Sequence, residues 1–199
     1  MASYRRADAG GAAWRSAQRS LLSCVATAVT PEVREAVVAD APAIAVVQSD
    51  AWRKAYVGLL PDGFVAEHAD PGRRATDWSA RLAHARSPQR TFVAVVDEAV
   101  AGFVSLGVWR GDPVPDPGTG ELYALYVRST YWRRGIGTAL VDIGAQVQRE
   151  DGFLRVRLWV VDGNDRALGF YRQHGWLDDG HRRLVDGTER SEQLLVRTL

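Results

Sequence analysis

The segment spanning residues 121–161 constrains the fold most, because its pattern predicts two strands joined by one helix. The runs 121–127 and 153–161 are short, apolar and rich in β-branched residues, as in buried strands. Between them, apolar residues recur at helical spacing from Ile136 through Leu140 to Val147. Two strands joined through a helix of that length form a parallel pair with a right-handed crossover. The chain is therefore expected to fold as an α/β protein.

Strand and helix patterns also fill the rest of the chain from residue 31 onward. Asp40 and Pro42 favour the start of a helix, and Gly175 favours the end of another. A short polar link at 97–98 joins two strand patterns into an antiparallel hairpin. We expect strands at 33–38, 90–96, 100–108, 121–127, 153–161, 176–185 and 190–198, and helices at 40–56, 71–85, 135–150 and 164–174. These elements predict a mixed, mostly antiparallel sheet of about seven strands with a central parallel pair, flanked by about four helices.

The composition argues against several classes of function. Lysine and arginine number 25 against 24 aspartate and glutamate, so the net charge of +1 gives no field that favours nucleic acid or an anionic membrane. No apolar run approaches the roughly 20 residues that a membrane-spanning helix needs. The single cysteine, Cys24, excludes an intrachain disulfide, and the four histidines lack metal-ligand spacing. We therefore expect no nucleic-acid partner, no membrane partner and no metal.

Residues 1–30 are expected to form a flexible N-terminal extension, and residues 31–199 a single domain. The first 30 residues hold few large apolar side chains and several arginines. The apolar run 21–29 could also indicate a signal peptide, but Ser23, Cys24 and Thr27 interrupt it. Cys24 is interpreted as a free thiol, because no histidine or acid lies nearby in the sequence to activate it.

A basic, glycine-containing loop at 132–138 connects the strand 121–127 to the helix that follows. Gly135 and Gly137 allow the backbone to approach a ligand closely. The free N–H groups of the helix start, together with Arg133 and Arg134, favour a phosphate. The loop alone is equally consistent with an ordinary glycine-rich helix start. It matches neither a P-loop nor a dinucleotide-binding fingerprint, because it lacks Gly-Lys-Ser/Thr and a third glycine at the right place.

The most specific signal comes from two segments taken together. They read Arg-Gly-Ile-Gly-x-Ala-Leu at 134–140 and Asn-x-Arg-Ala-x-x-Phe-Tyr-x-x-x-Gly-Trp at 164–176. Together they resemble the two central motifs of the GNAT superfamily of N-acetyltransferases, and the order of elements from residue 33 to residue 198 is similar to the whole of that fold. The chain departs from the family at Trp132 and Arg133, where members usually have glutamine or arginine and often glycine. That departure removes one side-chain contact to a pyrophosphate, while the backbone amides of 133–138 still serve.

The resemblance implies that acetyl-CoA is bound as co-substrate, with no metal. Its pyrophosphate would lie on the loop at 133–138, and its pantetheine arm would pair with the strand 121–127 like an added strand. In the family the two parallel strands splay apart, and a backbone N–H near 125–127 can polarise the thioester carbonyl. The cofactor-binding residues implied are Leu125, Tyr126, Val127, Arg133, Arg134, Gly135, Ile136, Gly137, Thr138 and Asn164.

The resemblance also implies two catalytic residues, because an attacking amine must lose a proton and a departing thiolate must gain one. Tyr171 matches the family's tyrosine and is the implied acid; the alternative is an aromatic residue of the core. Glu121 matches a position where several members carry a base that acts through water; the alternative is a solvated acid at a strand start. Arg166 is interpreted as a phosphate contact or as half of a helix-surface pair. His174 is expected to interact with the helix dipole and not to catalyse.

The expected function is transfer of the acetyl group of acetyl-CoA to a primary amine by a cytoplasmic N-acetyltransferase, directly within a ternary complex. One alternative is a non-catalytic acyl-CoA-binding or sensing module. Another is a nucleic-acid surface built from the arginines and Trp132, which the net charge disfavours. Members of the family often dimerise through their last strands, so a homodimer is a further expectation.

The amine acceptor is expected to enter opposite the cofactor, between the segments 52–70, 109–120 and 185–189. Aromatic candidates for the wall of its pocket are Trp52, Tyr56 and Trp109. Candidate acids for attracting a cationic amine are Asp62, Glu67, Asp70, Asp112 and Asp116, although acids in loops are usually only solvated. The sequence does not identify the acceptor.

Overall fold

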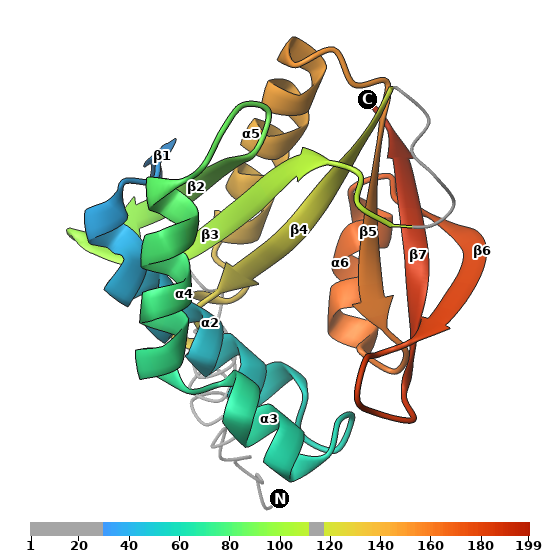
Figure 1. The fold of residues 1–199 in the computed structure, drawn as a ribbon. Helices are drawn as coiled ribbons and strands as arrows, with labels where there is room; N and C mark the ends of the chain where they lie inside the picture. Colours follow the sequence, from blue (N-terminus) through green and yellow to red (C-terminus); the bar gives the residue numbers. More distant parts are fainter. Residues whose placement is uncertain (1–29, 112–117) are drawn as a thin grey trace, which may run out of the picture.

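The computed structural model describes residues 30–111 and 118–199, and within them seven strands form one sheet in the order β1-β2-β3-β4-β5-β7-β6 (Figure 1). Neighbouring strands are antiparallel except β4 and β5, which are parallel. The predicted mixed sheet with a central parallel pair is confirmed. The extension expected at 1–30 lies outside the described residues up to residue 29, and so does Cys24. The strands are β1 (Glu32–Glu35), β2 (Arg90–Val96), β3 (Ala99–Val108), β4 (Thr119–Val127), β5 (Arg155–Val161), β6 (Leu177–Leu184) and β7 (Ser191–Thr198).

Five α-helices flank this sheet in the described residues. They are α2 (Ala41–Ala55), α3 (Asp62–His68), α4 (Pro71–Ala83), α5 (Ile136–Glu150) and α6 (Asp165–Gln173). Single 3-10 turns occur at Val38–Asp40 and Ser129–Tyr131. Four of the helices correspond to the predicted ones. The sequence did not predict α3, because seven residues between two prolines are too few to show a helical period.

The helices cover both faces of the sheet (Figure 1). On one face α2 and α4 bury a cluster that contains Ile44, Trp78 and Phe103. On the other face α5 and α6 pack against the sheet through a larger cluster, which includes Leu140 of α5 and Leu168 of α6. The chain therefore has one sheet between two helical layers, with a core on each side of it. None of these helices is long and apolar enough to cross a membrane, within the residues the structure describes.

Asp40 stands at the N-terminus of α2, as predicted, but its side chain does not cap that helix. Its carboxylate accepts hydrogen bonds from both terminal nitrogens of Arg34, each at 2.8 Å, and from the backbone N–H of Val37 at 2.8 Å. The Arg34 guanidinium holds the pKa of Asp40 below its ordinary value. The carboxylate thus ties β1 to the start of α2.

The parallel strands β4 and β5 stay together over three residue pairs only. Their register runs from Thr119 opposite Arg155 to Glu121 opposite Arg157, and beyond that pair the strands diverge (Figure 1). Burial changes at the same point: residues 119–122 of β4 are buried, whereas 123–127 are half-buried although they lie in the middle of the sheet. We call the opening between β4 and β5 the seam. It is the splayed pair that the resemblance implied.

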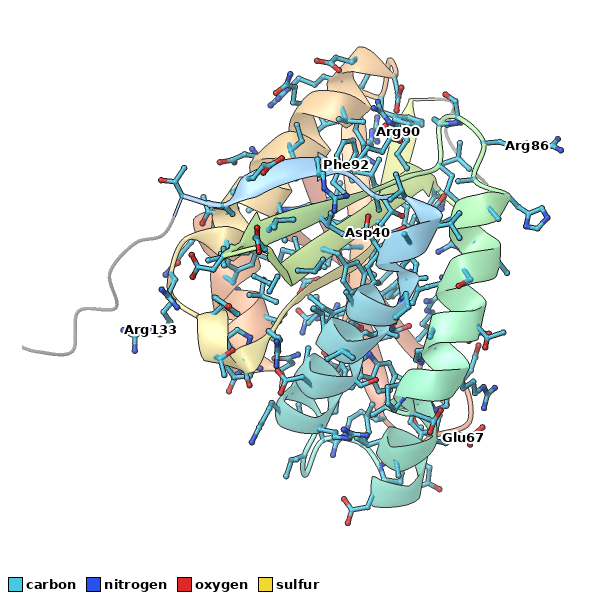
Figure 2. All side chains as sticks on the ribbon, turned by 90° about the vertical axis from the view of Figure 1, so that its left-hand side faces the viewer. Asp40, Glu67, Arg86, Arg90, Phe92 and Arg133 are labelled. Carbon is cyan, nitrogen blue, oxygen red and sulfur yellow. The ribbon has the colours of Figure 1, made fainter. Side chains whose placement is uncertain are left out.

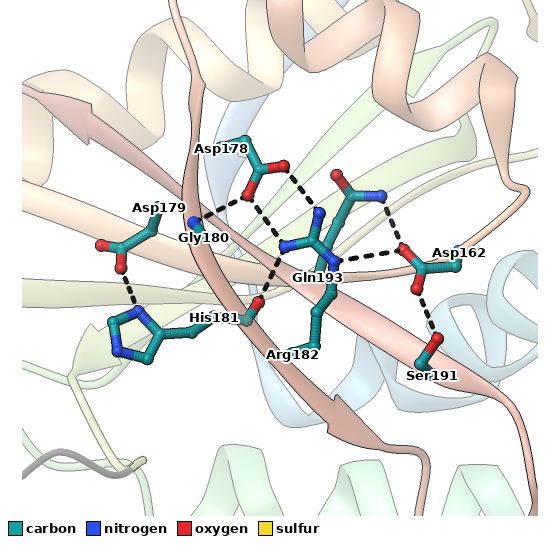
Figure 3. Close-up of polar contacts among 8 residues, drawn as sticks. All are labelled: Asp162, Asp178, Asp179, Gly180, His181, Arg182, Ser191 and Gln193. Carbon is teal, nitrogen blue, oxygen red and sulfur yellow. Dashed lines mark hydrogen bonds and ion pairs between the residues drawn. The ribbon is translucent and has the colours of Figure 1, made fainter.

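A polar network joins the C-terminal end of β5 to β7 and to the edge strand β6 (Figure 3). Asp162 accepts hydrogen bonds from the hydroxyl of Ser191 and, at 2.7 Å, from the side-chain amide of Gln193. On β6, Asp178 forms an ion pair with Arg182 at 2.7 Å, where the pairing of β6 with β7 is irregular. Irregular, charged edges discourage the addition of another strand. Dimerisation through the last strands stays a prediction, and this edge does not favour it.

Candidate active site

A cavity of about 760 Å³ opens at the seam. Its walls come from β4 and β5, from the loop and first turn of α5, and from α6, with α2 closing one side. The residues that line it are Ala51, Ala55, Tyr56, Leu122, Tyr123, Ala124, Leu125, Tyr126, Val127, Tyr131, Trp132, Arg133, Gly135, Gly137, Thr138, Leu158, Trp159, Val160, Asn164, Asp165, Arg166, Ala167, Gly169, Phe170, Tyr171, Gln173 and His174.

Most of the predicted cofactor-binding residues line this cavity, including the β4 residues Leu125, Tyr126 and Val127. Arg134 and Ile136 do not line it. Ile136 is 1% exposed and packs in the core, so only its backbone can face a ligand. The guanidinium of Arg134 instead lies 5.3 Å from the ring centroid of Tyr131.

The start of α5 presents free backbone donors to the cavity. Gly135 is the residue before the helix, has a φ of +88° and provides no side-chain cap. The backbone N–H groups of the first helical turn have no partner within the helix, and together with the helix dipole they favour an anion. Arg133 has a φ of +61°, a conformation that glycine adopts readily and most other residues do not. Its side chain projects away from the body of the protein (Figure 2).

Trp132, the departure from the family pattern, is held in place by β4. Its indole Nε1 donates a hydrogen bond to the carbonyl oxygen of Val127 at 2.7 Å. The guanidinium carbon of Arg166, from α6, lies 3.4 Å from the centroid of the indole ring. The helix-surface ion pair considered for Arg166 is not found among the described residues, and the side chain stacks on an aromatic ring instead.

Asn164 caps the N-terminus of α6. Its Oδ1 accepts a hydrogen bond from the backbone N–H of Ala167 at 3.2 Å. The residue is 8% exposed and lines the cavity, so its side-chain NH₂ group remains as a donor. The cap thus fixes Asn164 beside the seam, where the resemblance places a contact with pantetheine.

Tyr171 lies on the buried face of α6 and lines the cavity. Its ring packs edge-on against Phe170, at 5.3 Å between centroids, and against Trp176, at 5.6 Å. Burial raises the pKa of Tyr171 above its ordinary value of 10.0. The phenol is therefore protonated at neutral pH, as a proton donor must be. The position of Tyr171 is compatible with both interpretations, a catalytic acid and an aromatic residue of the core, since the side chain belongs to the core and also lines the cavity.

Glu121 occupies the last paired position of β4 before the seam. The residue is 8% exposed, and its carboxylate accepts a hydrogen bond from the backbone N–H of Arg110 at 2.9 Å. The Arg110 Nε lies 3.5 Å from the same oxygen. Glu121 is therefore not the solvated acid considered as an alternative. It does not line the cavity that holds Tyr171, so the structure does not bring the two predicted catalytic side chains into one pocket.

Aromatic side chains gather where the amine acceptor is expected to enter. The indole Nε1 of Trp52 donates a hydrogen bond to the hydroxyl of Tyr126 at 3.0 Å, and the ring of Trp52 packs edge-on against Tyr56 with centroids 4.8 Å apart. Burial raises the pKa of both tyrosines. Trp109, in contrast, is 2% exposed and does not line the cavity, whereas Trp159 of β5 does.

Two of the acids considered for attracting a cationic amine, Glu67 and Asp70, have structural partners, whereas Asp62 lies in the first turn of α3 with no hydrogen bond or ion pair to another described residue. Asp70 caps α4 by accepting from the N–H of Arg73 at 2.6 Å, and Glu67 pairs with the Arg73 side chain at 2.8 Å. Asp112 and Asp116 lie outside the described residues. A carboxylate that the sequence analysis did not consider is Glu192 of β7, whose pKa is raised by burial and which accepts from Arg183 at 2.6 Å; it does not line the cavity. No local pattern could have indicated it.

Metal-binding clusters are absent from the described residues, since nowhere in them do three or more His, Cys, Asp or Glu side chains gather to hold an ion. His174 is engaged at the end of α6. Its Nδ1 lies 2.8 Å from the carbonyl oxygen of Phe170, and its Nε2 lies 3.1 Å from the hydroxyl of Thr138. His174 thus links α6 to the first turn of α5.

Comparisons with known proteins point to one family. The sequence pattern of the Acetyltransferase (GNAT) family matches residues 50–176. The chain is 32% identical to the Uncharacterized N-acetyltransferase YuaI of Bacillus subtilis over 71% of this chain and 78% of that protein. It is 33% identical to a mycothiol acetyltransferase of Frankia alni over 53% of this chain, but spans only 34% of that relative's length. The crystal structure of PaiA N-acetyltransferase from Thermoplasma acidophilum in complex with coenzyme A has the same fold, with a TM-score of 0.67, 18% identity and coverage of 86% and 100%.

Proposed function

The chain belongs to the GNAT acetyltransferase family and is an acyltransferase, and on that premise we propose that it transfers the acetyl group of acetyl-CoA to a primary amine. We assign this activity to the domain at 31–199. The observation that carries the proposal is the seam, because its cavity meets an uncapped helix N-terminus at one end and a half-buried strand along its length.

The residues of the cavity fit acetyl-CoA. The backbone N–H groups at 136–138 would hold the pyrophosphate, because the positive φ of Gly135 leaves the first turn of α5 open to a ligand. The pantetheine arm would lie along Leu125 to Val127, where β4 has lost its pairing with β5. Asn164 would donate its side-chain NH₂ group to that arm from the opposite wall. When bound, acetyl-CoA supplies an activated thioester carbonyl.

We propose Tyr171 as the proton donor to the departing thiolate. Its hydroxyl belongs to a side chain that lines the cavity, and its raised pKa keeps the proton in place at neutral pH. The packing of the ring against Phe170 and Trp176 restricts its rotation, so the hydroxyl is preorganised. A backbone N–H within 125–127 would polarise the thioester carbonyl.

We propose Glu121 as the base that accepts the proton of the incoming amine through water. Two observations support this role. Glu121 belongs to the last residue pair of β4 and β5 before the seam opens, and the backbone N–H of Arg110 fixes its carboxylate through a hydrogen bond. A water relay is required because Glu121 does not line the cavity. The acceptor would bind among Trp52, Tyr56 and Trp159, and transfer would then be direct, within a ternary complex.

Calorimetric titration with acetyl-CoA and with CoA tests the cofactor site without a choice of acceptor. We expect saturable binding at one site for each. A screen of amines for thiol release then separates an enzyme from a binding module: acceptor-dependent release supports transfer, whereas binding with no release for any amine supports the non-catalytic alternative. No binding of either ligand would contradict the proposed cofactor site.

A further inference from the structure

Arg166 and Trp132 form a stacked pair at the cavity. The guanidinium carbon lies 3.4 Å from the indole centroid, which is a close cation–π contact. Arg166 belongs to the first turn of α6, and Trp132 precedes the glycine loop of α5. Both residues line the cavity. The pair therefore joins the two elements between which the cofactor is proposed to bind.

The aromatic platform under Arg166 is fixed. The indole N–H of Trp132 donates to the carbonyl oxygen of Val127 at 2.7 Å, so rotation of the ring would break a short hydrogen bond. An arginine that already rests on a fixed ring loses less conformational freedom when it binds a ligand. The stacked guanidinium keeps its N–H donors free in its own plane.

Arg166 has no acidic partner among the described residues, since no carboxylate there lies within ion-pair distance of it. Partial removal from water lowers the pKa of Arg166, and no carboxylate opposes this effect. The guanidinium of Arg166 is therefore available to form an ion pair with an anionic ligand.

The arginines of the loop itself do not take this role. Arg133 lines the cavity, but it is exposed and its side chain projects away from the protein (Figure 2). Arg134 packs over Tyr131 and does not line the cavity. Trp132 cannot form an ion pair with a phosphate, although it stands where other family members carry a polar side chain. The cation stacked on the Trp132 ring comes from α6.

We propose that Arg166, held on Trp132, provides the side-chain contact to the diphosphate of the cofactor in place of the loop residue. The inference rests on the proposed function, because it requires CoA in the cavity. The planar guanidinium suits two phosphate oxygens at once. In this chain two residues thus share the role: Trp132 positions the guanidinium of Arg166, and Arg166 binds the diphosphate.

Calorimetry with CoA and 3′-dephospho-CoA tests the pair. We expect Arg166→Gln to weaken the binding of both ligands about tenfold, because a charge-assisted hydrogen bond to phosphate is lost from each. Arg172→Gln is the matched control, since it removes the same charge from an exposed residue of the same helix that does not line the cavity. We expect this control to bind both ligands as the unchanged protein does.

The role of the platform is tested at Trp132. Trp132→Leu removes the aromatic face and should weaken CoA binding about threefold, whereas Trp132→Phe retains a face and should keep most of the affinity. Unchanged affinity in Arg166→Gln, with or without a lower melting temperature, would overturn the inference. So would a loss confined to CoA, which would place the contact at the 3′-phosphate. If the unchanged protein binds neither ligand, the proposed function itself fails.

Discussion

Gly135 and Gly152 stand at opposite ends of helix α5 and share a backbone φ of +88°. Their surroundings differ. Gly135 lines the cavity, whereas a Cβ at Gly152 would have no heavy atom within 4 Å. A side chain at either position meets the same backbone strain, but only one of them meets the proposed ligand. Substitutions at the two glycines therefore distinguish an effect on ligand binding from an effect of backbone strain alone.

Gly135→Val is expected to abolish CoA binding, because the side chain blocks the approach of a phosphate to the start of α5. Both Gly135→Val and Gly152→Val should lower the free energy of unfolding, by about 1–2 kcal/mol each, since a β-branched residue is strained at positive φ. Calorimetry measures the affinity, and urea denaturation measures the stability. CoA binding by Gly135→Val with normal affinity would show that the loop does not hold the pyrophosphate.

Tyr171→Phe should lower kcat roughly a hundredfold, the usual effect of losing a positioned proton donor. The affinity for acetyl-CoA should stay nearly the same, because the ring and its packing against Trp176 are retained. Steady-state thiol release and calorimetry on the same preparation give the two quantities. An unchanged kcat would leave Tyr171 with a structural role only.

Glu121→Gln should lower kcat/KM at neutral pH and recover part of it at high pH, where more of the amine is already deprotonated. The amide oxygen can still accept the hydrogen bond from the N–H of Arg110, so the local structure should survive. The measurement is the pH profile of kcat/KM.

Arg110→Gln provides the comparison for Glu121, because it removes the guanidinium near the carboxylate but keeps both the carboxylate and the backbone N–H. We expect a smaller loss than in Glu121→Gln and an unaltered dependence on pH. Equal losses and parallel pH profiles in the two variants would mean that Glu121 only anchors the 109–111 segment.

Asp40→Asn should destabilise the protein by about 1–2 kcal/mol at pH 7, because two hydrogen bonds from Arg34 lose their charged acceptor. The pKa of Asp40 is lowered in the folded protein from its ordinary value of 3.8. Its contribution is therefore complete above that value and is lost as the pH falls through the lower, folded pKa. Urea denaturation at pH 7 and near pH 3 should show the difference between Asp40→Asn and the unchanged protein shrinking in acid.

The exposed pair of Glu67 and Arg73 serves as the control for Asp40. The side chains of this pair are 60% and 63% exposed, respectively, so Glu67→Gln should have no measurable effect at either pH. A loss of stability in Glu67→Gln as large as that in Asp40→Asn would contradict the assignment of the effect to burial.

The sequence predicted the elements whose signals are local. Helix α5 has a long apolar period and lies between two strand patterns, so both its existence and the parallel pairing of its neighbours could be inferred. Helix α3 could not, because its position depends on tertiary contacts: Phe64 stacks on His68, and His68 stacks on Trp52, with centroids 4.0 and 5.3 Å apart. Such contacts leave no periodic trace in the sequence.

The sequence predicted the backbone elements of the candidate site, but not most of the contacts between its side chains. The alternation of inward and outward side chains along a strand could not predict where the side chain of Glu121 lies. The register of β3 with β4 shifts between Ser105 and Leu106, close to Glu121, and such an irregularity interrupts the alternation. The partner of Arg166 was equally hidden, since Trp132 lies 34 positions away in the sequence. Contacts of this kind depend on how the elements pack, which composition and spacing do not encode.

The seam gives this sheet an internal boundary. In the part of the chain that the structure describes, the register between β4 and β5 links strands β1 to β4 with strands β5 to β7 through three residue pairs, above a shared core. We expect amide hydrogen exchange to reveal two cooperative units that meet there, with the fastest exchange in β4 beyond Leu122. A ligand that bridges the units would protect both at once. At a concentration of one hundred times its Kd it would add about 2.7 kcal/mol to the free energy of unfolding, so this enzyme would be most rigid while it holds its own substrate.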